Sequence, residues 1–229
     1  MKVFWILVVF IWIKCGLIIA EENNNKNRKS SESEVFKPDE RNDEIHIPKD
    51  YDPRKEYPFI LNLHGYGSNG KGQLMFFPMK KLAEKYGFIF CAPDGIEKRW
   101  NATDACCDWK NEVDDSKYLR NLILKAMKAY NIDKKRVFVM GLSNGGFMSY
   151  RMAHDHSDLI TGIVPFAGVG FDQWPNTPDN PVSILHIHGT KDRTIKWAGG
   201  GVGRRRYPSA KDNFSKWKEF NNCKNKVEL

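Results

Sequence analysis

A serine flanked by glycines is the clearest chemical signal in this chain. Residues 141–145 read Gly-Leu-Ser-Asn-Gly and match the pattern G-x-S-x-G. They directly follow an apolar strand candidate at 137–140 and precede a helix-capable segment at 146–154. A sharp strand-to-helix turn of this kind holds a serine hydroxyl exposed for nucleophilic attack. We therefore predict that Ser143 is a nucleophile, and the competing interpretation is a glycine-rich turn with an incidental serine.

Two backbone amides are expected to stabilise the negative charge that such an attack creates. The N-terminus of the helix after the serine would place the N–H of Asn144 beside the developing oxyanion. Residues 63–67, Leu-His-Gly-Tyr-Gly, follow another strand candidate at 59–63, and a loop in this place supplies the second N–H. We predict that Tyr66 is this second donor. His64 precedes the serine in the chain, so we interpret it as a structural residue that holds the loop.

An aspartate late in the chain is the candidate that orients a general base. Residues 187–192 read Ile-His-Gly-Thr-Lys-Asp and follow the strand candidate 182–186. An acid at the C-terminal end of a strand, after the nucleophile, stands where a triad acid belongs. We predict this role for Asp192, with a simple turn aspartate as the alternative. His186 and His188 precede the acid, and we expect them to pack along the strand or to line the wall of a cleft.

The histidine of the expected triad has no candidate after the acid. Folds with this turn use the chain order serine, acid, histidine, and no histidine follows His188. We therefore expect a base beyond Leu229, and a 229-residue fragment that lacks its last strand–helix unit, is poorly stable and has almost no activity alone. If the chain were complete and active, the base would have to be His64, His186 or His188.

The elements around these residues predict a mostly parallel sheet with helices on both faces. Short β-branched or aromatic runs alternate with amphipathic segments, as in β-α units. The strand candidates are 59–63, 88–91, 137–140, 160–166 and 182–186.

Helix signals lie between and after these strand candidates. One apolar face runs from Leu119 to Tyr130 at helical spacing, and Asp114 stands at its cap position. A last helix is marked by Phe214, Trp217 and Phe220, with a start near residues 208–209. We expect the glycine- and arginine-rich run 199–206 to be a solvated loop.

The organisation of the chain predicts three parts. In residues 1–20, an apolar run at 3–20 follows Lys2 and ends at the small residue Ala20, which is typical of a secretory signal peptide. A signal anchor is the alternative, because the run is almost long enough to span a bilayer. Residues 21–43 are polar and indicate a disordered leader. We assign residues 44–229 to one catalytic domain, truncated at its C-terminus.

Export makes specific predictions for cysteines and asparagines. Cys91, Cys106, Cys107 and Cys223 remain after signal removal and allow three disulfide pairings. We expect at least one of the adjacent pair to form a bridge, with Cys223 as a possible partner, and Cys91 to be a buried thiol. The sequons at 101–103 and 213–215 predict N-glycosylation.

The charge of the chain bears on its partners. The formal net charge is +8, but no basic helix or RNA-binding aromatic pattern accompanies it, so we expect no nucleic-acid partner. Attraction to an acidic polysaccharide surface is compatible with this charge.

Six motifs in a fixed order resemble one family of enzymes. They are LHGYG at 63–67, CAPDG at 91–95, DACCDW at 104–109, EVDD at 112–115, GLSNGG at 141–146 and HGTKD at 188–192. Together they cover roughly residues 45–223. The set is similar to the secreted esterase family that joins feruloyl esterases to polyhydroxybutyrate depolymerases. The serine motif alone would name only the fold; the paired cysteines followed by Val-Asp-Asp narrow the resemblance.

The resemblance implies an α/β-hydrolase fold, no cofactor and no metal. It implies cleavage of esters of plant cell-wall phenolics or of hydroxyalkanoates. By motif, Ser143 is the nucleophile, Asp192 the triad acid, and the amides of Tyr66 and Asn144 the oxyanion donors. The family's histidine lies after its last strand, and this chain departs from the family because it ends before that position.

The resulting hypothesis is a secreted, extracellular serine carboxylic ester hydrolase of the feruloyl esterase type. Its substrate would be an ester, with a polysaccharide as one possible carrier, and it would have no stable membrane association after signal cleavage. Four aromatic residues could line a cleft for a feruloyl ring, or could equally be core: Tyr66, Trp100, Trp109 and Trp174. The alternatives are a polyhydroxybutyrate depolymerase or short-chain acyl esterase, and a non-catalytic secreted binding protein that lacks the triad histidine.

Overall fold

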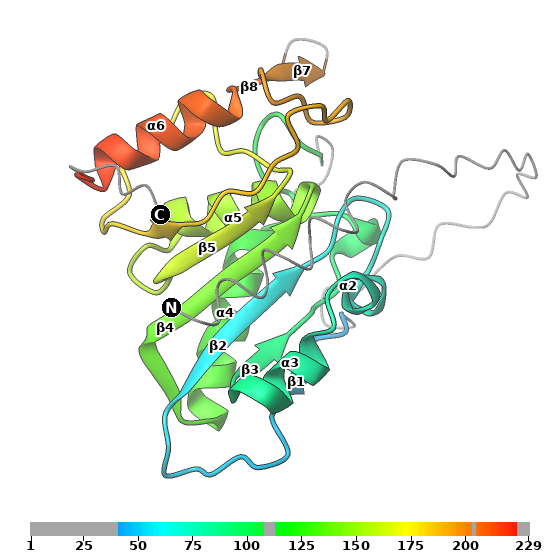
Figure 1. Ribbon diagram of the computed structural model, residues 1–229, viewed down its shortest axis with the longest axis vertical. Coiled ribbons are helices and arrows are strands. Elements are labelled where there is room, and N and C mark those ends of the chain that lie inside the picture. Colours follow the sequence, from blue (N-terminus) through cyan, green and yellow to red (C-terminus); the bar gives the residue numbers. More distant parts are fainter. Residues whose placement is uncertain (1–40, 108–112, 203–204, 224–229) are drawn as a thin grey trace, which may run out of the picture. The chain divides into compact units, whose positions relative to one another are not determined.

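The computed structural model describes residues 41–107, 113–202 and 205–223 (Figure 1). These residues belong to the compact unit that spans residues 36–229. The predicted signal peptide at 1–20 and residues 21–40 of the predicted leader lie outside the described residues.

A mostly parallel sheet of six strands forms the centre of the described domain (Figure 1). The strand order is β1-β3-β2-β4-β5-β6, and only β1 pairs antiparallel to its neighbour. The strands are β1 (Ile45–His46), β2 (Tyr57–Leu63), β3 (Ile89–Cys91), β4 (Ile132–Leu142), β5 (Gly162–Phe166) and β6 (Ser183–Ile184). The expected α/β architecture is thus confirmed, and each of the five strand candidates overlaps a strand.

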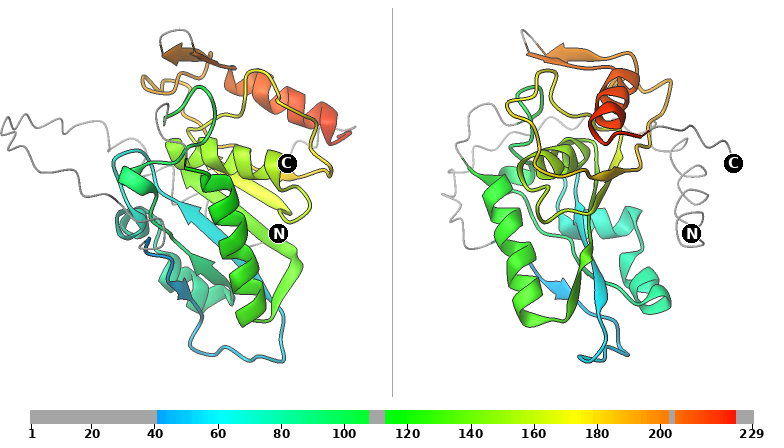
Figure 2. Two further views of the ribbon diagram at one scale, coloured as in Figure 1. Left: turned by 180° about the vertical axis from the view of Figure 1, so that it is seen from behind. Right: turned by 90° about the vertical axis from the view of Figure 1, so that its left-hand side faces the viewer.

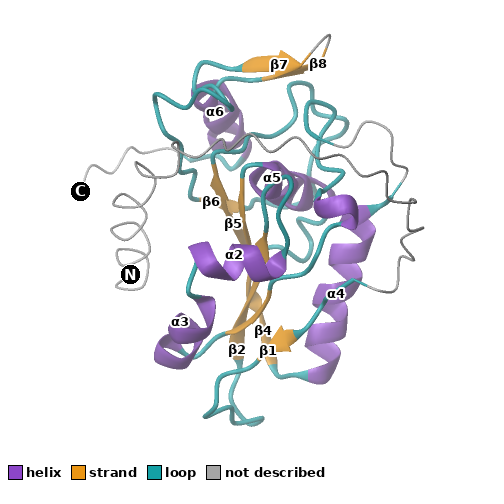
Figure 3. Cartoon of the chain, turned by 90° about the vertical axis from the view of Figure 1, so that its right-hand side faces the viewer, coloured by secondary structure: helices purple, strands orange, loops and turns teal. Residues whose placement is uncertain are grey.

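Helices cover both faces of this sheet. The helices are α2 (Gly70–Phe76), α3 (Met79–Tyr86), α4 (Asp115–Ala129), α5 (Asn144–Asp155) and α6 (Ala210–Phe220), with a 3₁₀ turn, η2 (Ile96–Lys98). Figure 2 and Figure 3 show α4 and α5 on one face and α2 and α3 on the other. The parallel strands are therefore buried between two helical layers, which explains their nearly continuous apolar sequences.

The predicted helix signals agree with the structure for α4 and in part for α6. The Asp114 side chain accepts a hydrogen bond from the N–H of Lys117 at 2.9 Å and caps α4. In α6, Ser209 is the N-cap and Trp217 is buried against Tyr150 of α5, with ring centroids 6.2 Å apart. Phe214 is 44% exposed, so it does not belong to the buried face that its spacing predicted.

Residues 41–43, which we placed at the end of a polar leader, are part of the fold. The Arg41 guanidinium forms a buried ion pair with Asp115 at 2.6 Å and lies 3.9 Å over the ring of Tyr118. Asp43 pairs with Lys125 at 2.7 Å. Composition alone could not reveal this, because the partners of these polar side chains lie more than 70 residues away in the sequence.

The run 199–206 is solvent-exposed at Gly201, Arg205 and Arg206, as predicted, but it is not an irregular loop. It contributes a small antiparallel hairpin of β7 (Gly200–Val202) and β8 (Arg205–Tyr207). Tyr207 at its end is buried and meets the ring of Phe147 edge-on at 5.9 Å. This distant aromatic contact, rather than local propensity, accounts for the ordered hairpin.

The cysteine predictions are confirmed in part. A disulfide joins Cys106 to Cys107, and Cys91 is a buried free thiol. Cys223 is free and exposed, so the suggested bridge to Cys223 is wrong. Burial in the apolar strand raises the pKa of the Cys91 thiol far above its usual range.

The predicted glycosylation sites fit the fold poorly. Asn213 is 2% exposed, and its Oδ1 accepts a hydrogen bond from the N–H of Gly170 at 3.1 Å. The Nδ2 of Asn101 donates to the carbonyl oxygen of Val113 at 3.0 Å. A glycan on Asn213 would therefore require the packing around α6 to open, and the structure contradicts that prediction for the folded protein.

Across residues 41–107, 113–202 and 205–223, no helix combines the length and the apolar character needed to cross a bilayer.

Candidate active site

Ser143 lies at the tight turn between β4 and α5, as predicted. Its backbone has φ 52° and ψ −114°, a left-handed conformation that non-glycine residues seldom adopt. The N–H of Ser143 donates to the carbonyl oxygen of Phe166 at 2.8 Å. This bond ties the turn to the end of β5 and holds the serine at the C-terminal edge of the sheet.

The glycines around the serine are required by close backbone contacts. A Cβ atom on Gly141 would collide with the backbone of Gly145. A Cβ atom on Gly145 would collide with the carbonyl oxygens of Leu63 and His64 at the end of β2. The G-x-S-x-G spacing thus lets β4, α5 and the loop after β2 approach one another.

The loop after β2 lies directly beside the serine. A Cβ atom on Gly65 would lie 3.7 Å from the Cβ of Ser143. Among the described residues, the backbone N–H of Tyr66 has no hydrogen-bond partner. Asn144 is the first residue of α5, where a helical N–H has no partner in a preceding turn. The structure therefore brings Ser143 together with the loop of Tyr66 and with Asn144.

The side chain of Asn144 has a structural role that the sequence did not suggest. It is fully buried, its Oδ1 accepts from the N–H of Trp100 at 2.7 Å, and its Nδ2 donates to the carbonyl oxygen of Trp100 at 3.0 Å. The same Nδ2 lies 3.7 Å from the sulfur of Cys106. Asn144 thereby fastens the loop of the disulfide to the start of α5.

His64 has the environment of a structural residue. Its Nδ1 donates to the carbonyl oxygen of Gly65 at 2.8 Å, and its Nε2 accepts from the N–H of Gly95 at 2.9 Å. Burial lowers the pKa of His64 below its ordinary value. Both ring nitrogens are occupied, so the imidazole holds the loop in place.

The four aromatic residues that were candidates for a cleft wall differ in burial and packing. Trp100 is fully buried, and its Nε1 donates to the carbonyl oxygen of His64 at 3.0 Å. Trp174 packs against Trp217 with ring centroids 4.9 Å apart. Both belong to the packing of the domain rather than to an open wall. Tyr66 is 61% exposed, and Trp109 lies outside the described residues.

Asp192 lies in a turn that follows the last strand of the sheet. Parallel pairing continues past β6, because the N–H of Ile187 donates to Pro165 O at 3.0 Å and that of Ala167 donates to Ile187 O at 2.8 Å. The Asp192 turn therefore leaves the same C-terminal edge of the sheet as the nucleophile turn, where ligands of open α/β sheets bind. The Asp192 Oδ1 accepts from the N–H of Ile195 at 3.0 Å.

The two histidines before Asp192 are bonded to each other. His186 Nε2 lies 3.2 Å from His188 Nδ1. His186 Nδ1 also contacts the Tyr150 hydroxyl at 2.8 Å, and His188 Nε2 contacts the carbonyl oxygen of Ile195 at 2.6 Å. Burial, followed by the neighbouring His188, lowers the pKa of His186 to about 4.

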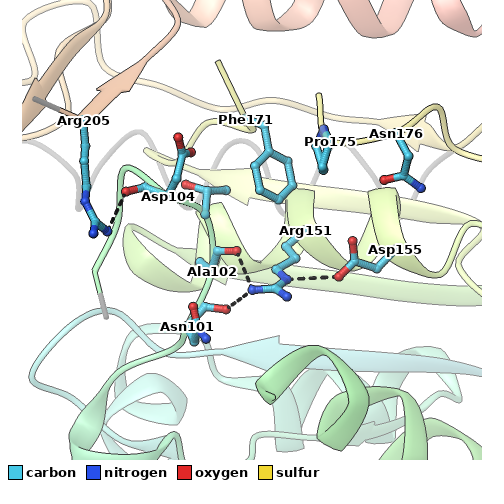
Figure 4. A pocket seen from close by; sticks show the side chains of 10 residues that line it. Asn101, Ala102, Asp104, Arg151, Asp155, Phe171, Pro175, Asn176 and Arg205 are labelled. Atoms are coloured by element: carbon cyan, nitrogen blue, oxygen red, sulfur yellow. Dashed lines mark hydrogen bonds and ion pairs between the residues drawn. The ribbon is translucent and has the colours of Figure 1, made fainter. Parts of the chain in front are cut away.

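A pocket of about 380 Å³ is lined by Arg151 and Asp155 of α5 and by the loop 101–104, among other residues (Figure 4). Arg151 crosses it, donating from Nε to Asp155 Oδ2 at 3.0 Å and from Nη1 to the carbonyl oxygen of Asn101 at 2.9 Å. The Ser116 hydroxyl also donates to Asp155. Burial alone would raise the pKa of Asp155, but the neighbouring His154, the hydrogen bond from Ser116 and the hydrogen bond and charge of Arg151 outweigh it and lower the pKa to about 2. None of the four predicted site residues lines this pocket.

Within the described ranges, no group of three or more His, Cys, Asp or Glu side chains is arranged to hold a metal ion.

Comparison with known proteins identifies esterases as relatives. Feruloyl esterase B of Piromyces equi is 27% identical over 192 residues, which are 78% of this chain and 35% of that protein. Probable feruloyl esterase C of Aspergillus terreus is 28% identical over 163 residues, 68% of this chain and 56% of that protein. Acetylxylan esterase A of Aspergillus oryzae is 31% identical over 124 residues, 53% of this chain and 40% of that protein. The chain thus spans about a third to just over a half of these relatives.

Solved structures support the same fold. The crystal structure of a thermostable esterase matches with a TM-score of 0.59 at 21% identity, over 77% of this chain and 47% of the other. The acetyl xylan esterase from Aspergillus awamori matches with a TM-score of 0.51 at 18% identity, over 77% of this chain and 93% of the other.

The family assignment rests on a match over most of the chain. The model of the Phospholipase/Carboxylesterase family covers residues 47–216, from before β2 into α6. The resemblance to feruloyl esterases is confirmed by relatives of that name, and the sheet and helices agree with it. The chain therefore belongs to the phospholipase/carboxylesterase family and has the α/β-hydrolase fold.

Proposed function

We propose that this protein is a secreted serine carboxylic ester hydrolase that forms an acyl-enzyme on Ser143. The observation that carries the proposal is the strained Ser143 turn, which lies beside the loop of Tyr66 and at the N-terminus of α5. A serine held in this way, next to two available backbone amides, fits acyl transfer. Relatives named as feruloyl and acetylxylan esterases support the same reaction class.

The proposed reaction has two acyl-transfer steps. Ser143 Oγ attacks the ester carbonyl carbon while its proton passes to a general base, and the amides of Tyr66 and Asn144 hold the tetrahedral oxyanion. The intermediate collapses, the C–O bond to the alcohol breaks, and the alcohol leaves with that proton. Water then attacks the acyl-enzyme, and the acid is released as Ser143 regains its proton. Asp192 orients the base and stabilises its charged form.

The general base is not assigned to His64, His186 or His188. In the described fold, Ser143 Oγ has no hydrogen bond to a histidine. His64, His186 and His188 each have both ring nitrogens engaged by protein groups. None of these three could accept the serine proton without giving up an existing hydrogen bond, so we do not assign the role to any of them.

The acyl group is proposed to be aromatic, as in a feruloyl ester. Tyr66 is 61% exposed beside the serine, so its ring is available to pack against an aromatic acyl group. An acetyl or other short-chain ester is the second candidate, because relatives include acetylxylan esterases. Secretion is supported by the apolar N-terminal run and by the disulfide between Cys106 and Cys107, since disulfides persist mainly outside the reducing cytosol.

Hydrolysis of two esters by the full-length protein tests these proposals. We expect methyl ferulate to be cleaved with a higher kcat/KM than p-nitrophenyl butyrate, and Ser143→Ala to abolish both activities without unfolding the protein, because loss of a triad member costs several orders of magnitude in rate. The reverse preference would favour a short-chain acyl esterase. Failure to cleave either ester would favour a non-catalytic binding protein. Ser143→Ala protein that retained more than about one per cent of turnover would exclude Ser143 as the nucleophile.

A further inference from the structure

A chain of hydrogen bonds connects the nucleophile helix to the turn that carries the proposed acid. Tyr150 lies on α5, two helical turns after its start, and its hydroxyl is 2.8 Å from His186 Nδ1. His186 Nε2 is 3.2 Å from His188 Nδ1, and His188 Nε2 is 2.6 Å from the carbonyl oxygen of Ile195. The proposed mechanism uses none of these side chains, although all are buried or half-buried.

The last residue in this series of hydrogen bonds, Ile195, also binds Asp192. Asp192 Oδ1 accepts from the N–H of Ile195 at 3.0 Å and from the N–H of Thr194 at 2.8 Å. The carbonyl oxygen of Ile195 accepts from His188. Both polar groups of one peptide residue are therefore fixed, one by the acid and one by His188. Asp192 Oδ2 lies 3.9 Å from His188 Nε2, beyond hydrogen-bond distance, and remains able to accept from a base.

Elementary hydrogen-bond chemistry assigns the protons along the chain. A carbonyl oxygen can only accept, so His188 Nε2 carries a hydrogen and donates to Ile195. In neutral His188 the Nδ1 must then accept, which places a hydrogen on His186 Nε2. His186 Nδ1 accepts in turn from the Tyr150 hydroxyl. All three donors point from α5 towards the Asp192 turn, and no ring nitrogen is left unsatisfied.

We propose that Tyr150, His186 and His188 are positioning residues that hold the Asp192 turn in register with the nucleophile helix. The inference rests on the proposed function, because it assigns a purpose to the acid. A carboxylate can orient a catalytic histidine only if it is itself fixed to within a fraction of an ångström. The hydrogen-bond chain supplies that fixation from α5, the same helix whose N-terminus follows Ser143.

Removal of single links should impair catalysis more than substrate binding. In the full-length protein, Tyr150→Phe deletes the first donor and His188→Phe deletes the last. We expect each to lower kcat roughly 10- to 100-fold with KM within about twofold. The acidic limb of the kcat/KM profile should move to lower pH, because a displaced carboxylate stabilises the charged base less. His188→Gln keeps an N–H donor for Ile195 and should restore most of the rate.

Two variants control for structural damage. The Tyr86 hydroxyl on α3 is buried without a hydrogen-bond partner, so Tyr86→Phe matches Tyr150→Phe but breaks no link. The ring nitrogens of His154, on the same helix as Tyr150, have no hydrogen-bond partner, and Nδ1 lies 3.6 Å from Asp155 outside the proposed network, so His154→Phe controls for the loss of a buried imidazole in His188→Phe. Rates are expressed per serine titrated with a fluorophosphonate, so unfolded protein does not count. Controls as impaired as the tested variants would overturn the inference.

Asp192→Asn separates the inference from the proposed function. If this variant were fully active, the proposed triad would be wrong. If it were inactive while Tyr150→Phe and His188→Phe kept wild-type kcat and pH profiles, the triad would stand and the inference would fall. A readout without turnover is ¹⁵N NMR of the histidine rings, where we expect His186 and His188 to be neutral with hydrogen on Nε2. Hydrogen on Nδ1 of either ring would contradict the proposed series of hydrogen bonds.

Discussion

The strained backbone conformation of Ser143 is held in place in part by the side chain of Asn144. The conformation of Ser143 costs on the order of 1–3 kcal/mol and persists only where its surroundings determine it. The bond from Ser143 N–H to Phe166 O fixes the turn on one side. The Asn144 side chain fixes it on the other through both polar backbone groups of Trp100. The sequence predicted Asn144 only as an amide donor, because its side-chain partners lie 44 residues away.

Substitution of Asn144 by alanine should separate these two roles. Asn144→Ala retains the backbone N–H of the proposed oxyanion site but removes the side chain that bonds the buried N–H and carbonyl of Trp100. We expect the free energy of unfolding to fall by about 1–3 kcal/mol, measured by urea denaturation. Asn176→Ala, at an exposed asparagine, should leave the midpoint unchanged. Equal midpoints for Asn144→Ala and the wild type would contradict the anchoring role.

The titration of His186 predicts how stability depends on pH. Its folded pKa of about 4 lies below the ordinary value of 6.5 because the ring is buried beside the Tyr150 hydroxyl and His188, with Trp197 near. The unfolded chain therefore binds more protons between pH 6.5 and pH 4, and the free energy of unfolding should decrease as the pH falls through that window. His186→Asn removes this titration, so its unfolding free energy should fall less steeply. Parallel pH dependences for variant and wild type would contradict the prediction.

At the scale of elements, local sequence patterns predicted the turns that backbone geometry requires. They missed the elements that depend on packing between distant segments. The glycine spacing around Ser143 predicted a tight turn, and the structure shows backbone at every place where a side chain would stand. The short helices α2 and α3 were not predicted: α2 has two glycines among seven residues, and α3 has only eight residues. The hairpin of β7 and β8 was also missed, since it depends on the burial of Tyr207 against Phe147.

Gly145 offers a test of the close approach between elements. Gly145→Ala would push a methyl group into the carbonyl oxygens of Leu63 and His64, and overpacking of this kind costs about 1–3 kcal/mol or more. We expect a lower melting temperature together with loss of esterase activity, because the loop of Tyr66 must move. Gly189→Ala is the matched control, since its Cβ would meet nothing nearer than 4.0 Å. An active, stable Gly145→Ala protein would show that the approach is not needed.

At the scale of the molecule, the described domain is closed by contacts between segments that are far apart in the chain. Asp115, at the start of α4, accepts hydrogen bonds from Arg41 at 2.6 Å and from the N–H of Asn101 at 2.7 Å. It thereby joins the beginning of the domain to the loop that Asn144 anchors. In the sequence Asp115 stands out only as the last residue of the EVDD motif, because a buried partner 74 residues earlier leaves no local pattern.

Loss of the Arg41 charge should therefore destabilise the whole domain. The side chains of Arg41 and Asp115 are 3% and 2% exposed, so Arg41→Met would keep the apolar stem but remove one partner of this buried ion pair. Removal of one partner from such a pair costs about 3–5 kcal/mol. The exposed pair of Arg54 and Asp52, at 2.9 Å, is the control, and Arg54→Met should change the free energy of unfolding by less than about 1 kcal/mol. Equal losses in the two variants, measured by chemical denaturation, would mean that Arg41 contributes no more than a surface charge and that the fold does not depend on residues before β1.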